Sequence, residues 1–241
     1  MKRWSAVLAA AVVLAAAGAA PAVGVAAPLT TREVVGTSVE GRPITLLHRG
    51  HDGARHRVLV IGTVHGDERA GMRVVRRLLD RPTLPRDLDL WLVKTANPDG
   101  TAADRRTNAH GVDLNRNFPY RWGSSPRGPT WSGPEPLSEP ESVVLQRLVR
   151  RLDPWLVVTF HQPLFGVGAN DKGMRTVRAL AAGMRLPVRE FHCTGVCHGT
   201  FSGWINHRTE GLAVTVEFGR TAPAWRIRRA AATVVAVGSR S

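Results

Sequence analysis

Several residue types are scarce in this chain of 241 residues. It has two cysteines and a single tyrosine, and aromatic side chains make up only 6% of it. Acidic side chains are outnumbered, with 19 Asp and Glu against 33 Lys and Arg, so the net charge is +14. The lack of tyrosine for base stacking, and arginines that are scattered along the chain, argue against a nucleic-acid-binding protein. The positive charge instead favours anionic partners such as wall polymers, lipid head groups or carboxylate-rich peptides.

Long apolar runs are absent except near the N-terminus. Lys2 and Arg3 precede an Ala, Val and Leu run from Ala6 to Ala20, followed by small residues suited to processing. The run is about 15 residues long, whereas a membrane-spanning helix needs about 20, so we expect no stable membrane insertion. The pattern predicts a signal peptide over residues 1–27, a single domain over 28–241 and a secreted or cell-wall location. An uncleaved N-terminal anchor is the alternative.

The two cysteines lie close together in the stretch "HCTGVCHG". Cys193 and Cys197 leave no odd thiol, and in an oxidising compartment they predict a disulfide that closes a small loop. The flanking His192 and His198 leave a small zinc site open as an alternative, although structural zinc usually has other ligand spacings.

Apolar segments typical of inner strands alternate with segments of helical periodicity. Two short strands are expected within residues 32–50, on either side of a turn at 40–43. Further strands are expected at 58–61, 88–94, 155–160 and 212–218, and the helices at 68–80, 138–152, 174–184, 202–208 and 223–237. Ser138 and Glu141 fit a capping box that opens the second helix, and the Gly- and Pro-rich residues 123–136 predict a surface loop. This alternation predicts an α/β three-layer sandwich with a mixed, largely parallel central sheet flanked by helices.

Polar side chains follow three of these strands. His65 and Glu68 come after the first, His161 ends another, and Glu217 ends the last. Ligand sites in α/β sheets collect beyond the carboxyl ends of strands, so these residues predict one shared pocket. Any one of them alone would more often be a hydrogen-bonded turn or core residue, and it is their coincidence that indicates a site.

Two imidazoles and one carboxylate are the protein ligands of a catalytic Zn²⁺, which keeps a further position open for water. We therefore predict one zinc ion held by His65, Glu68 and His161. A carboxylate outside this set is then needed to take a proton from the water and return it to the leaving nitrogen, and Glu217 is the candidate. The alternative for Glu217 is a salt bridge to one of the many arginines.

A polar segment at residues 105–119 offers further candidates. Asn115 and Arg116 provide an amide and a guanidinium, which binds both oxygens of a carboxylate. Asp113 is placed to accept the free N–H of a metal-bound imidazole. Each of the three has a simpler alternative role in stabilising the loop.

The order of these motifs resembles the zinc carboxypeptidase family, and its bacterial murein peptide amidase branch most of all. The resemblance covers about residues 32–237. The motifs that carry it are His65-x-x-Glu68, Asn97-Pro98-Asp99-Gly100, "GVDLNRNFP" at 111–119, His161-Gln162-Pro163 and Thr215-Val216-Glu217.

The resemblance implies a role for each matching residue. His65, Glu68 and His161 correspond to the zinc ligands and Glu217 to the general base. Asn115 and Arg116 correspond to the pair that holds a carboxylate on the leaving side, and Asp113 to the partner of the first histidine. An arginine that polarises the scissile carbonyl corresponds best to Arg106, with Arg105 as the alternative.

One departure from the family concerns a tyrosine. Digestive members carry a tyrosine in a mobile loop between the second histidine and the catalytic glutamate, whereas Tyr120 precedes His161 here. The residue that closes the site is therefore missing or replaced, for instance from within "GTFSGWINHR". A more open pocket that accepts branched or cross-linked peptides is expected.

We expect a secreted zinc-dependent peptide or amide hydrolase acting on peptidoglycan peptides, for example at the γ-D-Glu–diaminopimelate bond. No Gly-x-Ser-x-Gly elbow or His-Glu-x-x-His helix competes with this interpretation. The alternatives are a conventional secreted metallocarboxypeptidase, a deacylase of small acylated amino acids and, from a different class, a non-catalytic wall-binding protein.

Overall fold

The computed structural model describes residue 1 and residues 29–51, 53–191 and 198–240. The expected signal peptide and the pair Cys193–Cys197 lie outside the described residues, so both stay predictions. Among the helices of the described part, none is both long enough and apolar enough to cross a membrane.

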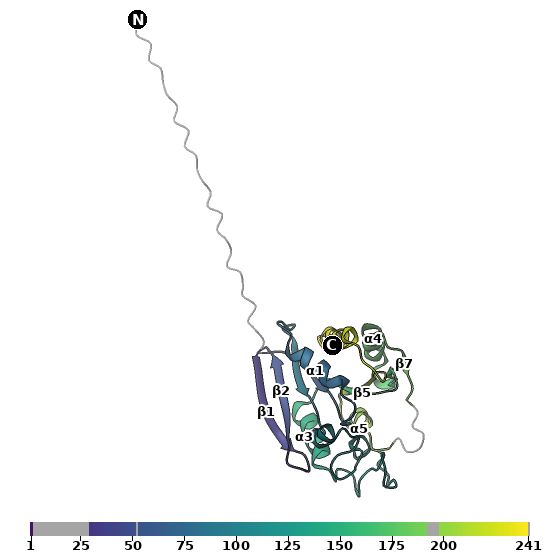
Figure 1. The fold of residues 1–241 in the computed structure, drawn as a ribbon. Coiled ribbons are helices and arrows are strands. Elements are labelled where there is room, and N and C mark those ends of the chain that lie inside the picture. The colour runs from purple at the N-terminus through teal and green to yellow at the C-terminus, as the bar shows by residue number, and fades with distance from the viewer. Residues whose placement is uncertain (2–28, 52, 192–197, 241) are drawn as a thin grey trace.

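The described residues form one mixed sheet of eight strands, in the order β1-β2-β4-β3-β5-β8-β6-β7. The four strands at its centre, β4, β3, β5 and β8, are mutually parallel, and the hairpin β1–β2 lies at one edge (Figure 1). The strands are β1 (Leu29–Thr37), β2 (Pro43–Gly50), β3 (His56–Ile61), β4 (Leu88–Val93), β5 (Leu156–His161), β6 (Gly166–Gly168), β7 (Val188–Arg189) and β8 (Leu212–Glu217).

Helices cover both faces of this sheet. They are α1 (Ala70–Leu79), α2 (Pro98–Ala103), α3 (Pro140–Leu152), α4 (Met174–Met184), α5 (Phe201–Arg208) and α6 (Ala224–Gly238), with 3-10 turns η1 (Leu114–Arg116) and η2 (Asp171–Gly173). Helices α1, α4 and α6 lie on one side of the sheet, and α3 and α5 lie on the other (Figure 1). The predicted three-layer α/β sandwich is confirmed.

The central strands are apolar on both faces because each face packs against helices. Side chains at 58 and 60 of β3 join the cluster beneath α1, α4 and α6, whereas those at 59 and 61 join the cluster beneath α3 and α5. All four are fully buried. This double-sided burial fixes the strand register and so fixes which residues stand at the carboxyl ends.

Every helix and strand expected from the sequence is present in the structure, although the first or last residues of some differ from the expected ranges. Helix α3 does not begin with the predicted Ser138–Glu141 capping box, and that prediction is wrong. Its N-cap residue is Glu139 and Pro140 is the first helical residue, because the fixed φ of proline suits that position and it needs no partner for an N–H. The Oε1 of Glu141 instead accepts from the backbone N–H of Val39, 3.2 Å away.

Three short elements were not expected from the sequence. Helix α2 begins within the Asn97-Pro98-Asp99-Gly100 motif, with the Asn97 side chain accepting from the Gly100 N–H at 2.8 Å. Strands β6 and β7 are three and two residues long. Elements of this length carry too few residues to show a period.

Gly71 lets α1 approach the sheet closely. A Cβ at this position would lie 1.9 Å from the Gly62 carbonyl oxygen and 2.4 Å from the Phe160 Cβ. We predict that Gly71→Ala lowers the free energy of unfolding by about 1–3 kcal/mol, as expected for overpacking. Urea unfolding monitored by circular dichroism measures this, with the exposed Arg77→Ala on the same helix as control. Equal unfolding midpoints for Gly71→Ala and wild type would contradict the predicted close packing.

Candidate active site

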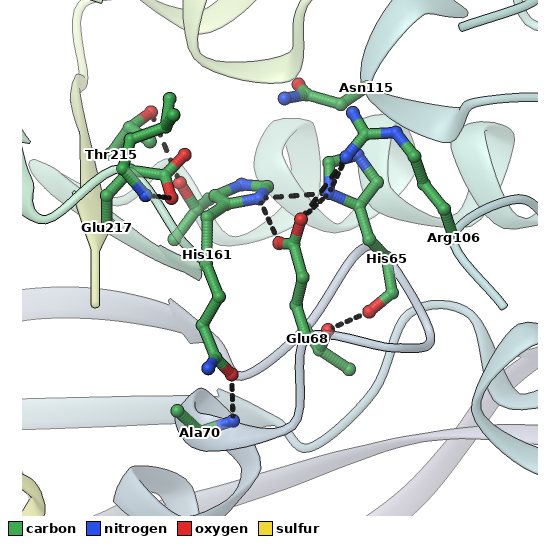
Figure 2. Close-up of polar contacts among 12 residues, drawn as sticks. His65, Glu68, Ala70, Arg106, Asn115, His161, Thr215 and Glu217 are labelled. Atoms are coloured by element: carbon green, nitrogen blue, oxygen red, sulfur yellow. Dashed lines mark hydrogen bonds and ion pairs between the residues drawn. The ribbon is translucent and has the colours of Figure 1, made fainter. Parts of the chain in front are cut away.

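The candidate site lies at the carboxyl ends of three parallel strands. His65 and Glu68 lie in the segment between β3 and α1, His161 is the last residue of β5, and Glu217 is the last residue of β8. His161 and Glu217 stand opposite each other in the β5–β8 register. Figure 2 shows these four side chains converging from their separate segments, as the sequence predicted.

The segment that carries His65 and Glu68 is held by close contacts at both ends. Gly66 lies against Gly100 of α2, where a Cβ would come within 2.0 Å of the carbonyl carbon. At the other end, the Gln162 Oε1 accepts from the Ala70 N–H at 2.9 Å and satisfies one of the unpaired donors at the start of α1. The turn between β3 and α1 is therefore fixed by α2 and by the residue that follows β5.

His65, Glu68 and His161 form a group that can hold a metal ion. All three are buried, and one ligand atom from each lies within 4.8 Å of the others. The Glu68 carboxylate lies 2.8 Å from the His65 Nδ1 and 2.9 Å from the His161 Nδ1. The two Nδ1 atoms are 3.3 Å apart, about the separation of two nitrogen ligands on one tetrahedral zinc ion.

The electrostatics of this group favour a cation. Burial lowers the pKa of His65, but the carboxylates of Glu68 and Asp113 outweigh it and raise the pKa to about 9. Burial likewise raises the pKa of Glu68, yet His65 and His161 bring it well below its usual range. The donor set, its spacing and its preference for positive charge all fit zinc.

Asp113 links the metal group to the rest of the site. Its carboxylate is fully buried and accepts from the His65 Nε2 at 3.0 Å. It also accepts from the Arg106 Nε at 3.1 Å and Nη2 at 2.8 Å, and from the Asn115 backbone N–H at 2.9 Å. Because the His65 Nε2–H donates to Asp113, the ring presents Nδ1 to the metal group. This is the contact expected from the sequence between Asp113 and a metal-binding imidazole.

The arginine beside the metal group is Arg106, whereas Arg105 is exposed and does not line the cavity. The Arg106 Nη1 lies 3.2 Å from the Glu68 Oε1. Asn115 and Arg116 also line the cavity, and the Asn115 Oδ1 accepts from the Phe201 N–H at 3.0 Å. This bond leaves the side-chain NH₂ of Asn115 as a donor for a ligand.

Glu217 lies outside the metal group but lines the same cavity. Its Oε2 accepts from the Leu164 N–H at 3.2 Å, and no arginine salt bridge holds it among the described residues. Burial raises its pKa, although the nearby His161 partly offsets this effect. A buried carboxylate with a raised pKa is suited to general base catalysis near neutral pH.

The cavity has a volume of about 330 Å³ and is lined by several residues that the sequence did not single out. These are Gln162, Pro163, Leu164, Phe191, Thr200, Ser202 and Thr215. Gln162, Pro163 and Thr215 belong to the quoted motifs, and Thr200 and Ser202 lie in the quoted stretch "GTFSGWINHR". No pattern in the sequence indicated Leu164 or Phe191. Tyr120 is not among the lining residues and stacks instead on His207, with ring centroids 4.0 Å apart.

Residues 26–163 match the family model described as zinc carboxypeptidase. The chain belongs to the zinc carboxypeptidase family. The family assignment confirms the predicted zinc metallopeptidase class and its zinc cofactor, and the group of His65, Glu68 and His161 supplies a site for it. The roles of the individual side chains stay predictions.

Among curated relatives, murein peptide amidase A of Vibrio campbellii is 31% identical over 208 residues, which cover 80% of this chain and 81% of that protein. The enzyme of the same name from Escherichia coli K12 is 35% identical over 145 residues, 55% of this chain and 59% of that protein. The aligned part thus spans little more than half of the E. coli protein.

Solved structures share the fold. Murein-tripeptide amidase from Escherichia coli O157 matches with a TM-score of 0.69 and 26% identity, over 87% of this chain and 92% of that one. Carboxypeptidase A from Helicoverpa armigera gives a TM-score of 0.74 at 20% identity, over 87% of this chain and 68% of that one. The predicted resemblance to the family and to its murein amidase branch is confirmed.

Because Asp113 orients His65, we predict that Asp113→Asn weakens zinc binding about 10- to 100-fold. Competition with a chromogenic chelator measures the affinity. Asp104→Asn is the control, since Asp104 is 73% exposed and pairs only with Arg69 among the described residues. Wild-type zinc affinity in Asp113→Asn would contradict the orienting role of this carboxylate.

Proposed function

We propose that this protein is a zinc-dependent amidase of peptidoglycan peptides, acting outside the cell on the bond between γ-D-Glu and a diamino acid such as meso-diaminopimelate. The observation that carries this proposal is the convergence of His65, Glu68, His161 and Glu217 on one cavity, in a chain similar over four fifths of its length to a murein peptide amidase. The N-terminal leader pattern supports an extracytoplasmic location.

The charges around the cavity fit a substrate rich in carboxylates. Arg106 and Arg116 both line it, and the chain as a whole carries a net charge of +14. A guanidinium binds a carboxylate through two parallel hydrogen bonds, which makes it selective for such groups. Peptidoglycan stem peptides carry free carboxylates on both sides of the proposed bond, so both parts of the substrate can be recognised.

Each side chain then has a defined task in hydrolysis. Bound zinc supplies Lewis-acid polarisation of the scissile carbonyl and of the attacking water. Glu217 takes a proton from that water as its oxygen bonds to the carbonyl carbon, and Arg106 donates to the oxygen that gains negative charge. The C–N bond breaks as Glu217 returns the proton to the leaving nitrogen, and the products are a carboxylate and an amine.

Asn115 and Arg116 hold the leaving part of the substrate. The Arg116 Nη1 donates to the Asn115 backbone carbonyl oxygen at 2.7 Å, which ties the guanidinium to the backbone of the neighbouring residue. Because Phe201 N–H occupies the Asn115 Oδ1, the groups offered to the substrate are donors, as a carboxylate requires. Holding this carboxylate places the scissile carbonyl between Arg106 and Glu217.

The position of Tyr120 is relevant to the kind of substrate that the cavity accepts. Tyr120 stacks on His207 and does not line the cavity. A tyrosine lid closing over a C-terminal carboxylate, the arrangement of digestive relatives, is therefore not supplied by this residue. The absence of Tyr120 from the lining supports a substrate that continues beyond the leaving carboxylate, such as a branched stem peptide.

The substrate proposal is tested with the zinc-loaded protein and two peptides, L-Ala-γ-D-Glu-meso-diaminopimelate and a conventional α-linked peptide with a free C-terminus. We expect release of diaminopimelate, detected by mass spectrometry, at a kcat/KM at least about tenfold above that for the α-linked peptide. Preference for the α-linked peptide would identify a conventional carboxypeptidase instead.

Substitutions of Glu217 and His161 are predicted to affect zinc content and activity differently. Glu217→Gln should keep one zinc per chain, because Glu217 is not in the metal group, and should lose activity by a factor of about 10²–10⁴ with the general base. His161→Ala should lose zinc as well as activity. Metal analysis and turnover on the same samples measure both effects. A Glu217→Gln variant with near-normal rates would show that another group accepts the proton.

A further inference from the structure

A second hollow adjoins the catalytic cavity. It has a volume of about 440 Å³ and shares one lining residue, Arg106, with the cavity that holds the metal group. Its other lining residues are Thr107, His110, Gly111, Arg127, Gly128, Pro129 and Trp131. A Cβ added at Gly111 or Gly128 would meet no atom within 4 Å, so the space beside these residues is open.

The lining of this hollow is basic. It includes Arg106, Arg127 and His110, and no Asp or Glu is among its lining residues. Arg106 is turned toward the catalytic side, where its guanidinium contacts Asp113 and Glu68. The Arg127 guanidinium lies over the Trp131 ring at 4.2 Å from its centroid and forms no ion pair among the described residues. Arg127 is thus the cation of the hollow that remains available to a ligand.

His110 is oriented by a buried carboxylate. Its Nδ1 lies 2.8 Å from the Glu139 Oε2, and the Glu139 side chain is only 2% exposed while that of His110 is 56% exposed. The same Glu139 oxygen accepts from the Asn108 Nδ2 at 2.6 Å. The exposed edge of the His110 ring is therefore held in place at the hollow.

The wall formed by residues 127–131 is anchored to the catalytic residues. The Asp113 N–H donates to the Trp131 carbonyl oxygen at 2.8 Å, so the backbone of Trp131 is bonded to the residue that orients His65. The Asn117 Nδ2 donates to the next carbonyl, that of Ser132, at 2.9 Å. These bonds fix the backbone of Trp131 and Ser132 relative to Asp113 and the metal group, and the Arg127 guanidinium packs on the Trp131 ring.

We infer that this hollow binds the acyl part of the substrate and that Arg127 recognises a carboxylate there, namely the free α-carboxylate of the γ-linked glutamate. This inference rests on the proposed function. Asn115 and Arg116 line the catalytic cavity but not the hollow. When these two residues hold the leaving part of a substrate in the cavity, its acyl part extends past Arg106 into the hollow.

The chemistry of a γ-linked glutamate fits this position. Its side chain carries the scissile carbonyl, so its α-carboxylate stands a few bonds away on the acyl side and remains charged at neutral pH. A guanidinium stacked on an aromatic ring is already ordered, so it loses less conformational freedom on binding than a free arginine side chain. Arg127 would thus distinguish a glutamate from its α-amide.

The test compares two substrates that differ at this group alone: L-Ala-γ-D-Glu-meso-diaminopimelate and the same tripeptide with D-isoglutamine, whose α-carboxylate is an amide. In the zinc-loaded protein, Arg127→Ala is expected to lower kcat/KM about tenfold for the acid and by less than about twofold for the amide, as for loss of one charged hydrogen bond. Arg127→Lys should restore part of the activity on the acid, because the charge is kept while the stacked, forked guanidinium is lost.

Arg76→Ala is the charge-matched control. Arg76 is 82% exposed and lines a separate hollow with Arg73 and Arg77, so its loss should change neither substrate. Equal effects of Arg127→Ala on acid and amide, or no effect on either, would overturn the inference while leaving the amidase intact. Failure of the wild-type protein to cleave either tripeptide would overturn the proposed function, and the inference with it.

Discussion

The buried carboxylate of Asp113 is the constraint on which the site depends. A fully buried charge is tolerated only when its oxygens are satisfied, and here the donors are the His65 ring, the Arg106 guanidinium and the Asn115 backbone. Those three groups belong to the metal group, the carbonyl-binding side and the leaving side of the proposed reaction. One desolvated charge thus positions three groups, and removing it would leave Arg106 with Glu68 as its remaining acidic partner among the described residues.

This network also explains how long connections support a precise site. The strands place His161 and Glu217 directly, but Arg106, Asp113 and Asn115 lie between α2 and α3, outside any strand. Their positions come from side-chain and backbone hydrogen bonds, including the bond from the Asp113 N–H to the Trp131 carbonyl. The strand ends and the segment after β3 carry the metal group and Glu217, while the bonded loop carries the groups assigned to the substrate in the proposed reaction.

The positions of the metal group and of Glu217 could be predicted from the sequence, because ligand sites in α/β sheets collect at the carboxyl ends of strands. Apolar runs ending in His161 and Glu217 are long enough to be recognised, and parallel pairing brings their ends together. The choice between Arg105 and Arg106 could not be made, because neighbouring side chains differ in direction only once the backbone is known. The capping box failed because the proline at 140 decides where the helix begins, and the hollow beside Arg127 requires contacts between residues distant in sequence.

The pairing of His161 with Glu217 across β5 and β8 has a consequence for folding. Side chains alternate between the faces of a strand, so a slip of β8 by one residue would send Glu217 to the opposite face of the sheet. The metal group, carried by β5 and the segment after β3, would survive such a slip. In the proposed reaction such molecules would carry zinc and lack the general base, so the packing of Val214 and Val216 beneath α4 and α6 serves the position of Glu217 as well as the stability of the fold.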